Sequence, residues 1–153
     1  MCTRFDKSYL RMAKIWAENS HARRHKVGAI IVKDGMIISD GYNGTPAGFD
    51  NNCEDEVVTH EFDSEGYYSD YTHLVTKPEV LHAEANAITK VAKSTNSSEG
   101  ATLYVTLSPC LECAKLIIQS GIKKVFYEEF AYNHPEGVEL LKKAGIEVEQ
   151  INI

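Results

Sequence analysis

The segment Thr102–Gly121, TLYVTLSPCLECAKLIIQSG, decides the fold because it changes from a strand to a helix within a few residues. Its first six residues are β-branched, aromatic or leucine, a composition that favours a buried strand. Its second half repeats apolar residues at helical spacing and ends at Gly121, a typical helix stop. Pro109 suits the first turn of a helix, where its missing N–H costs nothing. The segment therefore predicts a strand followed by a helix, with Cys110 and Cys113 at the helix start.

The sequence around this segment predicts further strands and helices in alternation. A hairpin is expected in KVGAIIVKDGMIISDGYNG, because two β-branched runs flank the turn Lys33-Asp34-Gly35. The other expected elements are a helix over residues 5–19, a helix in HAEANAITKVAK, strands in ATLYVTL and IKKVFYEE, a helix over residues 135–143 that closes at Gly145, and a short strand in IEVEQINI. Strands that alternate with helices after an initial hairpin predict an α/β layered fold with a mixed sheet.

Two segments carry more specific expectations. The first helix has Phe5, Tyr9, Met12, Ile15 and Trp16 at helical spacing, which predicts an amphipathic helix with these residues as its apolar stripe. Residues 49–78 are polar and aromatic without clean periodicity, so a long loop is expected there. A loop of this length in a compact domain is usually functional or locally stapled.

Composition restricts the class of protein. The 153 residues are 43% hydrophobic and 25% charged, which suits one globular domain over residues 1–153. Four cysteines are too few for a disulfide scaffold, and no apolar run reaches the ~18 residues of a membrane span. The charged N-terminal segment resembles no signal peptide, so we expect a soluble cytoplasmic protein. A net charge of −6 argues against a broad nucleic-acid surface.

Cys110 and Cys113 are spaced to bind a metal. Residues at i and i+3 project from one face of a helix, and two thiolates there can share one tetrahedral ion. His82 opens the preceding helix and offers a third ligand, which leaves the fourth position for water, as in catalytic zinc sites. Glu84 is then the natural general acid and base beside the metal. The alternatives for a lone C-x-x-C are a structural zinc knuckle and a redox pair, but the chain has no second C-x-x-C.

The pattern H-x-E…P-C-x-x-C is the signature of zinc nucleobase deaminases. The stretches GYNGTPAG, HAEANAI and LYVTLSPCLECAKLIIQSGIKKVFY resemble the deoxycytidylate (dCMP) deaminases of the cytidine deaminase-like superfamily, especially the phage-encoded type. The resemblance extends from Val27 to Val148. It implies a three-layer α/β/α fold with a mixed five-stranded sheet, one catalytic zinc ion, and hydrolysis of dCMP to dUMP and ammonia, which supplies dUMP for thymidylate synthesis.

The expected chemistry assigns roles to several residues. Glu84 takes a proton from water, passes it to ring N3 of the base and later protonates the departing amino group. By resemblance, the backbone N–H of Ala83 holds the base O2 and Asn43 holds the sugar hydroxyl. The cluster HARRHK predicts a phosphate pocket; its members are His21, Arg23, Arg24, His25 and Lys26. A solvated basic turn is the alternative interpretation of this cluster.

The sequence also allows three other functions. They are deamination of another cytosine nucleotide or nucleoside, deamination of adenosine in tRNA, and a zinc-stabilised binding module without activity. The acidic balance argues against an RNA substrate, and a binding module has no need of Glu84.

The resemblance further implies regulation and assembly. Related enzymes bind dCTP as activator and dTTP as inhibitor, with Mg²⁺ on the triphosphate, and commonly form homohexamers. The loop expected to bind the effector has backbone suited to phosphates; its candidate residues are Gly41, Tyr42, Asn43, Gly44, Thr45 and Gly48. A plain turn at the exit of the hairpin is the alternative.

A second, structural zinc ion is also implied by resemblance to the phage-type enzymes. Its candidate ligands are His21, Cys53, His73 and Glu79, with His60 as a substitute for Glu79. Such an ion would order the long loop, which lacks a core of its own. The alternative is that Cys53 is an ordinary buried thiol and His73 an exposed side chain.

Overall fold

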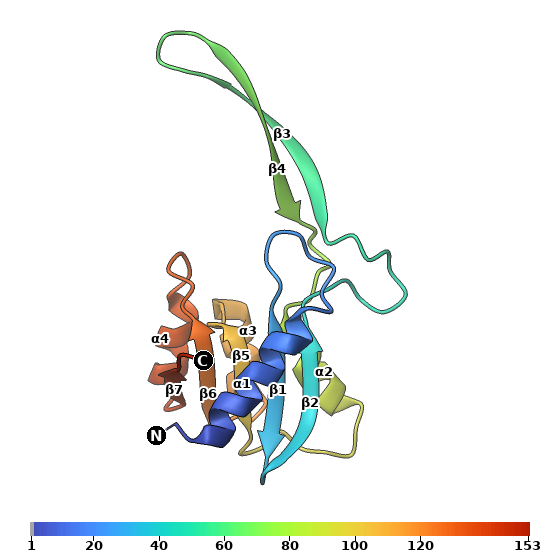
Figure 1. Ribbon diagram of the computed structural model, residues 1–153, viewed down its shortest axis with the longest axis vertical. Coiled ribbons are helices and arrows are strands. Elements are labelled where there is room, and N and C mark those ends of the chain that lie inside the picture. Colours follow the sequence, from blue (N-terminus) through green and yellow to red (C-terminus); the bar gives the residue numbers. More distant parts are fainter. Residues whose placement is uncertain (1) are drawn as a thin grey trace.

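A five-stranded sheet forms the centre of the computed structural model, which describes residues 2–153 (Figure 1). Its strands are β1 (Gly28–Lys33), β2 (Met36–Tyr42), β5 (Thr102–Leu107), β6 (Lys124–Glu129) and β7 (Glu147–Gln150). The spatial order is β2-β1-β5-β6-β7, with β1 antiparallel to β2 and β5, and with β5, β6 and β7 parallel. The mixed five-stranded sheet expected from the sequence is confirmed.

Helices cover both faces of this sheet. The helix α1 (Arg4–Ala17) lies on one face, and α2 (Ala83–Ala92), α3 (Leu111–Gln119) and α4 (Glu136–Lys143) cover the other (Figure 1). The predicted three-layer arrangement is therefore correct. None of the described helices is long and apolar enough to span a bilayer.

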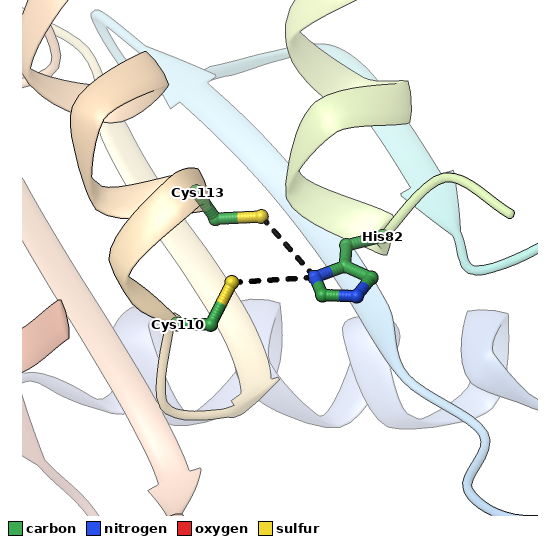
Figure 2. A group of neighbouring side chains, drawn as sticks. All are labelled: His82, Cys110 and Cys113. Atoms are coloured by element: carbon green, nitrogen blue, oxygen red, sulfur yellow. Dashed lines mark hydrogen bonds between the residues drawn. The ribbon is translucent and has the colours of Figure 1, made fainter. Parts of the chain in front are cut away.

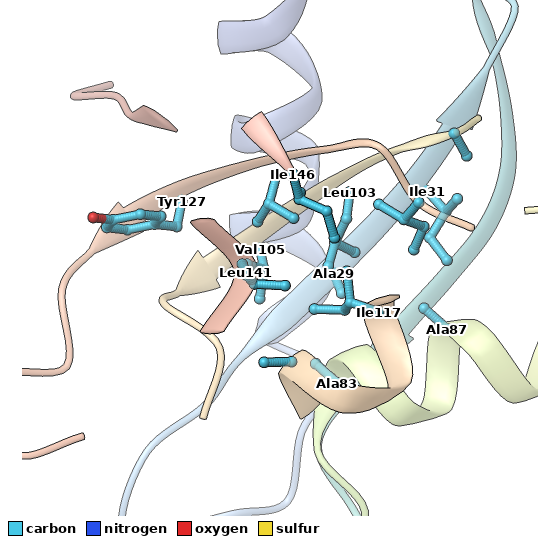
Figure 3. Close-up of a cluster of buried hydrophobic side chains, with 14 of the residues drawn as sticks. Ala29, Ile31, Ala83, Ala87, Leu103, Val105, Ile117, Tyr127, Leu141 and Ile146 are labelled. Atoms are coloured by element: carbon cyan, nitrogen blue, oxygen red, sulfur yellow. The ribbon is translucent and has the colours of Figure 1, made fainter. Parts of the chain in front are cut away.

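Two apolar clusters hold the layers together. The larger one lies between the sheet and α2, α3 and α4, and Figure 3 shows part of it. Its fully buried side chains include Ile31, Leu103, Ile117 and Leu141. The smaller one lies under α1 and includes the stacked rings of Tyr104 and Phe126, whose centroids are 5.2 Å apart. Each fully buried aliphatic side chain of this size stabilises the fold by ~1.5–3 kcal/mol.

The first helix turns a different face to the sheet than its sequence predicts. Its buried residues are Leu10, Ala13 and Ala17, whereas Phe5, Met12, Ile15 and Trp16 are exposed; of the predicted stripe, only Tyr9 packs inward, against Tyr104. The reason is close packing, because a Cβ added at Gly28 would lie 1.9 Å from the Ala13 carbonyl oxygen. Only small side chains fit at this distance, so the larger apolar residues face outward.

Residues 49–78 do not form the irregular loop that we expected. They contain a regular antiparallel hairpin of β3 (Glu54–Phe62) and β4 (Tyr68–Thr76), which projects from the body of the molecule (Figure 1). The turn is closed by the Asp63 carboxylate, which accepts the backbone N–H groups of Glu65 and Tyr67. Most side chains on both faces of the hairpin are exposed, so the sequence lacks the alternation that a half-buried strand shows.

The predicted hairpin between β1 and β2 is confirmed. Asp34 and Gly35 both have positive φ, 51° and 74°, which suits a two-residue turn of type I′. The helices and strands expected after residue 80 are also present, within a few residues of their predicted ends.

Candidate metal centre and active site

Two helix starts converge to form the candidate metal centre. His82 is the N-cap residue of α2 and Cys110 is the N-cap residue of α3, with Cys113 in the first turn of α3. The helices lie side by side, so that the imidazole of His82 faces both sulfur atoms (Figure 2). The strand β5 leads directly into α3, as the sequence of this segment predicts.

The distances within this group suit a zinc ion. His82 Nδ1 lies 3.4 Å from Cys110 Sγ and 3.5 Å from Cys113 Sγ. One nitrogen and one sulfur at ordinary zinc bond lengths in a tetrahedral site lie about 3.6 Å apart. Among residues 2–153, this is the one group of three or more potential ligands close enough to share an ion. The donor set and its spacing therefore fit zinc with an open fourth position.

Hydrogen bonds among Cys110, Cys113 and His82 shift the pKa values of all three side chains. A hydrogen bond from Cys113 lowers the pKa of Cys110 to about 3, with His82 contributing in the same direction and burial opposing. The pKa of Cys113 is raised by that same hydrogen bond and by its burial. The hydrogen bond with Cys110 raises the pKa of His82. One thiolate is therefore available before a metal binds, and binding would release the remaining protons.

Glu84 is a buried carboxyl group beside these ligands. It lies in the first turn of α2, and its side chain is 4% exposed. Burial raises its pKa, while the Cys113 thiol and the positive charge of His82 act in the opposite direction. A carboxyl group with a raised pKa exchanges protons more readily near neutral pH, which suits a general acid and base.

A cavity of about 480 Å³ opens over this centre. Its wall includes the predicted residues His82, Ala83, Glu84 and Asn43. The other lining residues are Ala22, Arg24, His25, Val27, Cys53, Glu54, Thr76, Val80, Leu107, Ser108, Cys110, Ala131, Asn133 and His134. The metal group and the proposed proton carrier thus open into a space large enough for a small organic molecule.

The basic cluster divides between two environments. Arg24 lines the cavity, and its Nη1 donates to Thr76 Oγ1 at 3.1 Å. Arg23 instead faces the hairpin, where its guanidinium lies 3.6 Å from Glu54 Oε2 and 3.4 Å from Glu56 Oε1. Lys26 is exposed and is not among the described residues that line the cavity. Of the five residues in the predicted phosphate pocket, Arg24 and His25 line the cavity, whereas His21, Arg23 and Lys26 are not among the described residues that line it.

The side-chain amide of Asn43 makes two hydrogen bonds to the segment that precedes β1. Its Oδ1 accepts the N–H of Val27 at 2.9 Å, and its Nδ2 donates to the His25 carbonyl at 2.8 Å. It therefore holds the segment after Arg24 against β2, in addition to lining the cavity.

Comparison with known proteins agrees with this geometry. Residues 3–129 match the model of the cytidine and deoxycytidylate deaminase zinc-binding region. The chain belongs to this deaminase family. It is 41% identical to the deoxycytidylate deaminase of Enterobacteria phage T4 over 91% of this chain and 86% of that protein. It is also 37% identical to ComE operon protein 2 of Bacillus subtilis, over 97% of this chain and 72% of that protein.

A solved structure is similar over the whole length of the deaminase. The dCMP deaminase of the cyanophage S-TIM5, determined in complex with dCMP and dUMP, is 40% identical and superposes with a TM-score of 0.82. The alignment covers 99% of both chains. The resemblance to phage deoxycytidylate deaminases that the motifs indicate is thereby confirmed.

In this deaminase the GYNG segment packs against the metal helix. A Cβ added at Gly41 would lie 2.4 Å from the Ala83 carbonyl oxygen, so β2 and α2 approach too closely for a larger residue. Gly44 exchanges two backbone hydrogen bonds with Leu81, directly before His82. The Asn43 N–H is likewise engaged, with the Val27 carbonyl. These residues position the ligand helix, a role that sequence reasoning did not assign to them.

The candidate ligands of a second zinc ion are not brought together. His21, Cys53, His73 and Glu79 form no group of three or more ligand atoms close enough for one ion within residues 2–153. Cys53 is buried, its thiol 3.5 Å from the Asn51 carbonyl, and His73 lies exposed on β4 beside Thr59. His60, the substitute ligand, contacts Asp70 and Tyr68 near the hairpin turn.

Glu54 and His134 are two titratable residues in the cavity wall that the sequence did not predict. Glu54 is 1% exposed; its Oε1 accepts the N–H groups of Arg23 and Arg24, and its Oε2 has no hydrogen-bond partner in the described part of the chain. In the sequence it is one of seven carboxylates between residues 54 and 76, and only burial distinguishes it. His134 lies in the loop before α4, and no motif marks it.

Proposed function

We propose that this chain is a zinc-dependent deaminase that converts dCMP to dUMP and ammonia. The observation that carries the proposal is a single cavity lined by two residues of the three-ligand zinc group, His82 and Cys110, together with the buried carboxyl group of Glu84 and the cation of Arg24. The names of the related phage proteins and the nucleotides in the cyanophage structure support dCMP as the substrate.

The residues of the cavity supply the steps of a hydrolytic deamination. A zinc ion held by His82, Cys110 and Cys113 would polarise a water molecule for attack on C4 of cytosine. Glu84 takes a proton from that water and gives it to N3, so that C4 becomes a better electrophile. After the C4–O bond has formed, Glu84 takes the remaining proton from the new hydroxyl group on C4 and delivers it to the amino group. The C4–N bond then breaks and ammonia leaves.

The start of α2 is suited to hold the base. The N–H of Ala83 is among the first N–H groups of the helix, which have no acceptor within the helix itself. Ala83 lines the cavity between His82 and Glu84, so its N–H is available to the O2 of a cytosine whose C4 faces the metal group. Asn43 also lines the cavity, and its remaining donor and acceptor positions suit the sugar hydroxyl.

The phosphate is assigned to the side of the cavity formed by the basic cluster. Arg24 and His25 come from this cluster, and His134 comes from the loop before α4. A guanidinium binds a phosphate through two parallel hydrogen bonds, which distinguishes a nucleotide from a nucleoside. This assignment keeps Arg24 and His25 from the predicted cluster and leaves out His21, Arg23 and Lys26.

Regulation by dCTP and dTTP, with Mg²⁺ on the triphosphate, belongs to the proposal by resemblance alone. The backbone N–H groups of Asn43 and Gly44 already bind the chain's own carbonyls. The part of the loop from Thr45 to Gly48 is therefore the better candidate for the effector phosphates. Sigmoidal dependence of rate on dCMP that becomes hyperbolic with dCTP would support regulation, and identical curves would contradict it. A homohexamer is proposed on the same resemblance.

The deciding experiment is a substrate comparison on the purified, zinc-loaded chain. Release of ammonia and formation of dUMP are measured with dCMP, deoxycytidine, CMP and a tRNA stem-loop that contains adenosine. We expect the highest kcat/KM with dCMP and at least a tenfold lower value with deoxycytidine, which lacks the phosphate. Equal values for dCMP and deoxycytidine would contradict the phosphate assignment. No turnover of any cytosine compound would leave a zinc-stabilised binding module as the better description.

A further inference from the structure

The β3–β4 hairpin leaves apolar side chains uncovered. It projects from the body, and its strands pair with each other and, within residues 2–153, with no other strand (Figure 1). Phe62 is 72% exposed and Tyr67 is 69% exposed; the other exposed large apolar residues of the hairpin are Val57, Val58, Tyr68, Tyr71 and Val75. An isolated two-stranded hairpin is marginally stable at best in water. A partner surface is therefore needed to cover it.

The hairpin is also strongly acidic. Residues 54–76 contain seven of the 22 carboxylates of the chain and no lysine or arginine. At the base of the hairpin, Asp55 and Glu56 are paired with Lys77 and Arg23. The unbalanced negative charge thus lies toward the turn, close to the most exposed aromatic rings. The complementary surface must be apolar and basic.

The outer face of α1 has this composition. Its exposed apolar residues are Phe5, Met12, Ile15 and Trp16, and its exposed cations include Arg4, Lys7 and Arg11. The single carboxylate of the helix, Asp6, is engaged with Tyr104 and with the N-terminal cap. The inner face of α1 is already packed on the sheet, so the outer face is available to a partner.

We infer that the hairpin of one copy of this chain docks on the outer face of α1 in a second copy. Opposite charges and matching apolar surface favour this pairing over contact between two hairpins, which would bring together the unbalanced carboxylates near the two turns. The lengths are compatible, because nine residues of strand extend ~30 Å and the 14 residues of α1 extend ~21 Å. The hairpin points away from the body and from its own α1 (Figure 1).

The hairpin and the outer face of α1 are two different surfaces, so each copy can bind one neighbour through each of them. An open chain of copies leaves a free hairpin at one end and a free α1 at the other, whereas a ring leaves neither, so a closed assembly is expected. The inference rests on the self-association in the proposed function, but not on its chemistry. Docking also bears on the active site, because Glu54 and Thr76 at the base of the hairpin line the cavity.

Reversed or added charges in two variants test the pairing. The helix variant carries Arg4→Glu, Lys7→Glu and Arg11→Glu, and the hairpin variant carries Glu61→Lys, Glu65→Lys and Thr72→Lys. All six side chains are exposed. The control variant carries Lys115→Glu, Lys142→Glu and Lys143→Glu on α3 and α4, which lie on the opposite face of the sheet. Each protein is examined by sedimentation velocity over a concentration series, with zinc content and circular dichroism as checks on folding.

We expect the unmodified chain and the control variant to assemble, and each reversed variant to associate at least tenfold more weakly. An equimolar mixture of the helix and hairpin variants should assemble again, because each then offers the surface that the other lacks. A monomeric unmodified chain, unchanged assembly of either variant, or a mixture that stays monomeric would overturn the inference. Assembly that is restored by mixing, in a chain that fails to deaminate dCMP, would support this inference and contradict only the proposed chemistry.

Discussion

Gly137 lies directly against the backbone of Cys110. A Cβ added at Gly137 would come within 2.7 Å of the Cys110 carbonyl carbon and within 1.9 Å of the Pro109 carbonyl oxygen. The helix α4 thereby fixes the position of a zinc ligand from outside the ligand group. Because the contact is with backbone atoms, no side-chain rotation can relieve it.

The first prediction concerns this contact. Gly137→Ala should destabilise the fold by about 2 kcal/mol, the usual cost of overpacking, and lower the melting temperature by ~4–8 °C. We also expect at least a tenfold weaker affinity for zinc, since the carbonyl of Cys110 must move. Lys142→Ala on the exposed side of α4 is the control. Calorimetry and zinc competition with a chelator measure both effects, and an unchanged zinc affinity would show that Gly137 does not position the ligand.

The second prediction separates the proton carrier from the ligands. Glu84→Gln should lower kcat for dCMP about 10³-fold or more and leave the zinc content unchanged, because the carboxyl group moves protons without binding the metal. Cys113→Ala should lose both zinc and activity, since two protein ligands hold zinc poorly. Metal analysis and ammonia release on the same preparations distinguish the two. Substantial activity in Glu84→Gln would remove the role assigned to this residue.

Metal removal gives the third prediction. A chelator should abolish turnover, and one equivalent of zinc per chain should restore it, because the described residues bring together one group of three ligands. Cys53→Ser should retain this stoichiometry. A second tightly bound zinc ion that is lost in Cys53→Ser would show that His21, Cys53, His73 and Glu79 gather around a metal after all.

The fourth prediction is a dependence of stability on pH at the N-terminus of α1. Asp6 accepts the N–H of Thr3 at 2.7 Å and the hydroxyl of Tyr104 at 2.5 Å. Burial alone would raise the pKa of Asp6, but these hydrogen bonds outweigh it, so the pKa is lowered. A pKa below the unfolded value of ~3.9 means that the stabilisation is present above that pH and is lost as the pH falls through the folded value.

Asp6→Asn should therefore destabilise the chain by ~1 kcal/mol at pH 7, with a difference that shrinks below about pH 4. Urea unfolding of both proteins between pH 3 and pH 7 measures this difference. Comparing the two proteins at each pH cancels the loss of zinc that both undergo in acid. Glu139→Gln, an exposed change in the first turn of α4, is the control. A difference that is independent of pH would contradict the role of the Asp6 charge.

Local signals in the sequence were sufficient to predict the three residues of the candidate metal centre. Pro109, the i and i+3 cysteines and the H-x-E motif each determine a position at a helix start, and the strand β5 brings the two helix starts together. Long-range packing was not predictable in the same way. The outward face of α1 depends on the close approach of Ala13 to Gly28, a contact between two segments that no periodicity encodes.

The β3–β4 hairpin shows a second limit of prediction from the sequence. Its strands lack alternating polarity because most side chains on both faces are exposed, so the rule that identifies half-buried strands does not apply. The prediction of a loop in place of the hairpin also affected the site. Glu54 is recognised as a buried cavity residue only when the base of the hairpin lies beside Arg24. The separation of Arg23 from Arg24 has the same origin, because Glu54 and Glu56 pair with Arg23.

The last prediction assigns Glu54 a positioning role. Its Oε1 accepts the N–H of Arg23 at 2.8 Å and that of Arg24 at 3.2 Å, which fixes the backbone from which the Arg24 guanidinium reaches the cavity. Glu54→Ala would leave both N–H groups without this acceptor and free the segment to move. Since the affected group is the proposed phosphate contact, the change should act on binding of the nucleotide rather than on the chemical step.

We therefore expect Glu54→Ala to raise KM for dCMP about tenfold, with kcat within a factor of two and an unchanged KM for deoxycytidine. Arg24→Gln should give the same selective effect, up to ~100-fold, because a charge-assisted hydrogen bond to phosphate contributes ~1.5–3 kcal/mol. Glu56→Ala, which removes an exposed partner of Arg23, is the matched control and should change neither value. Equal losses with dCMP and deoxycytidine would mean that Glu54 only stabilises the fold, and a normal KM for dCMP in Arg24→Gln would move the phosphate site elsewhere in the cavity.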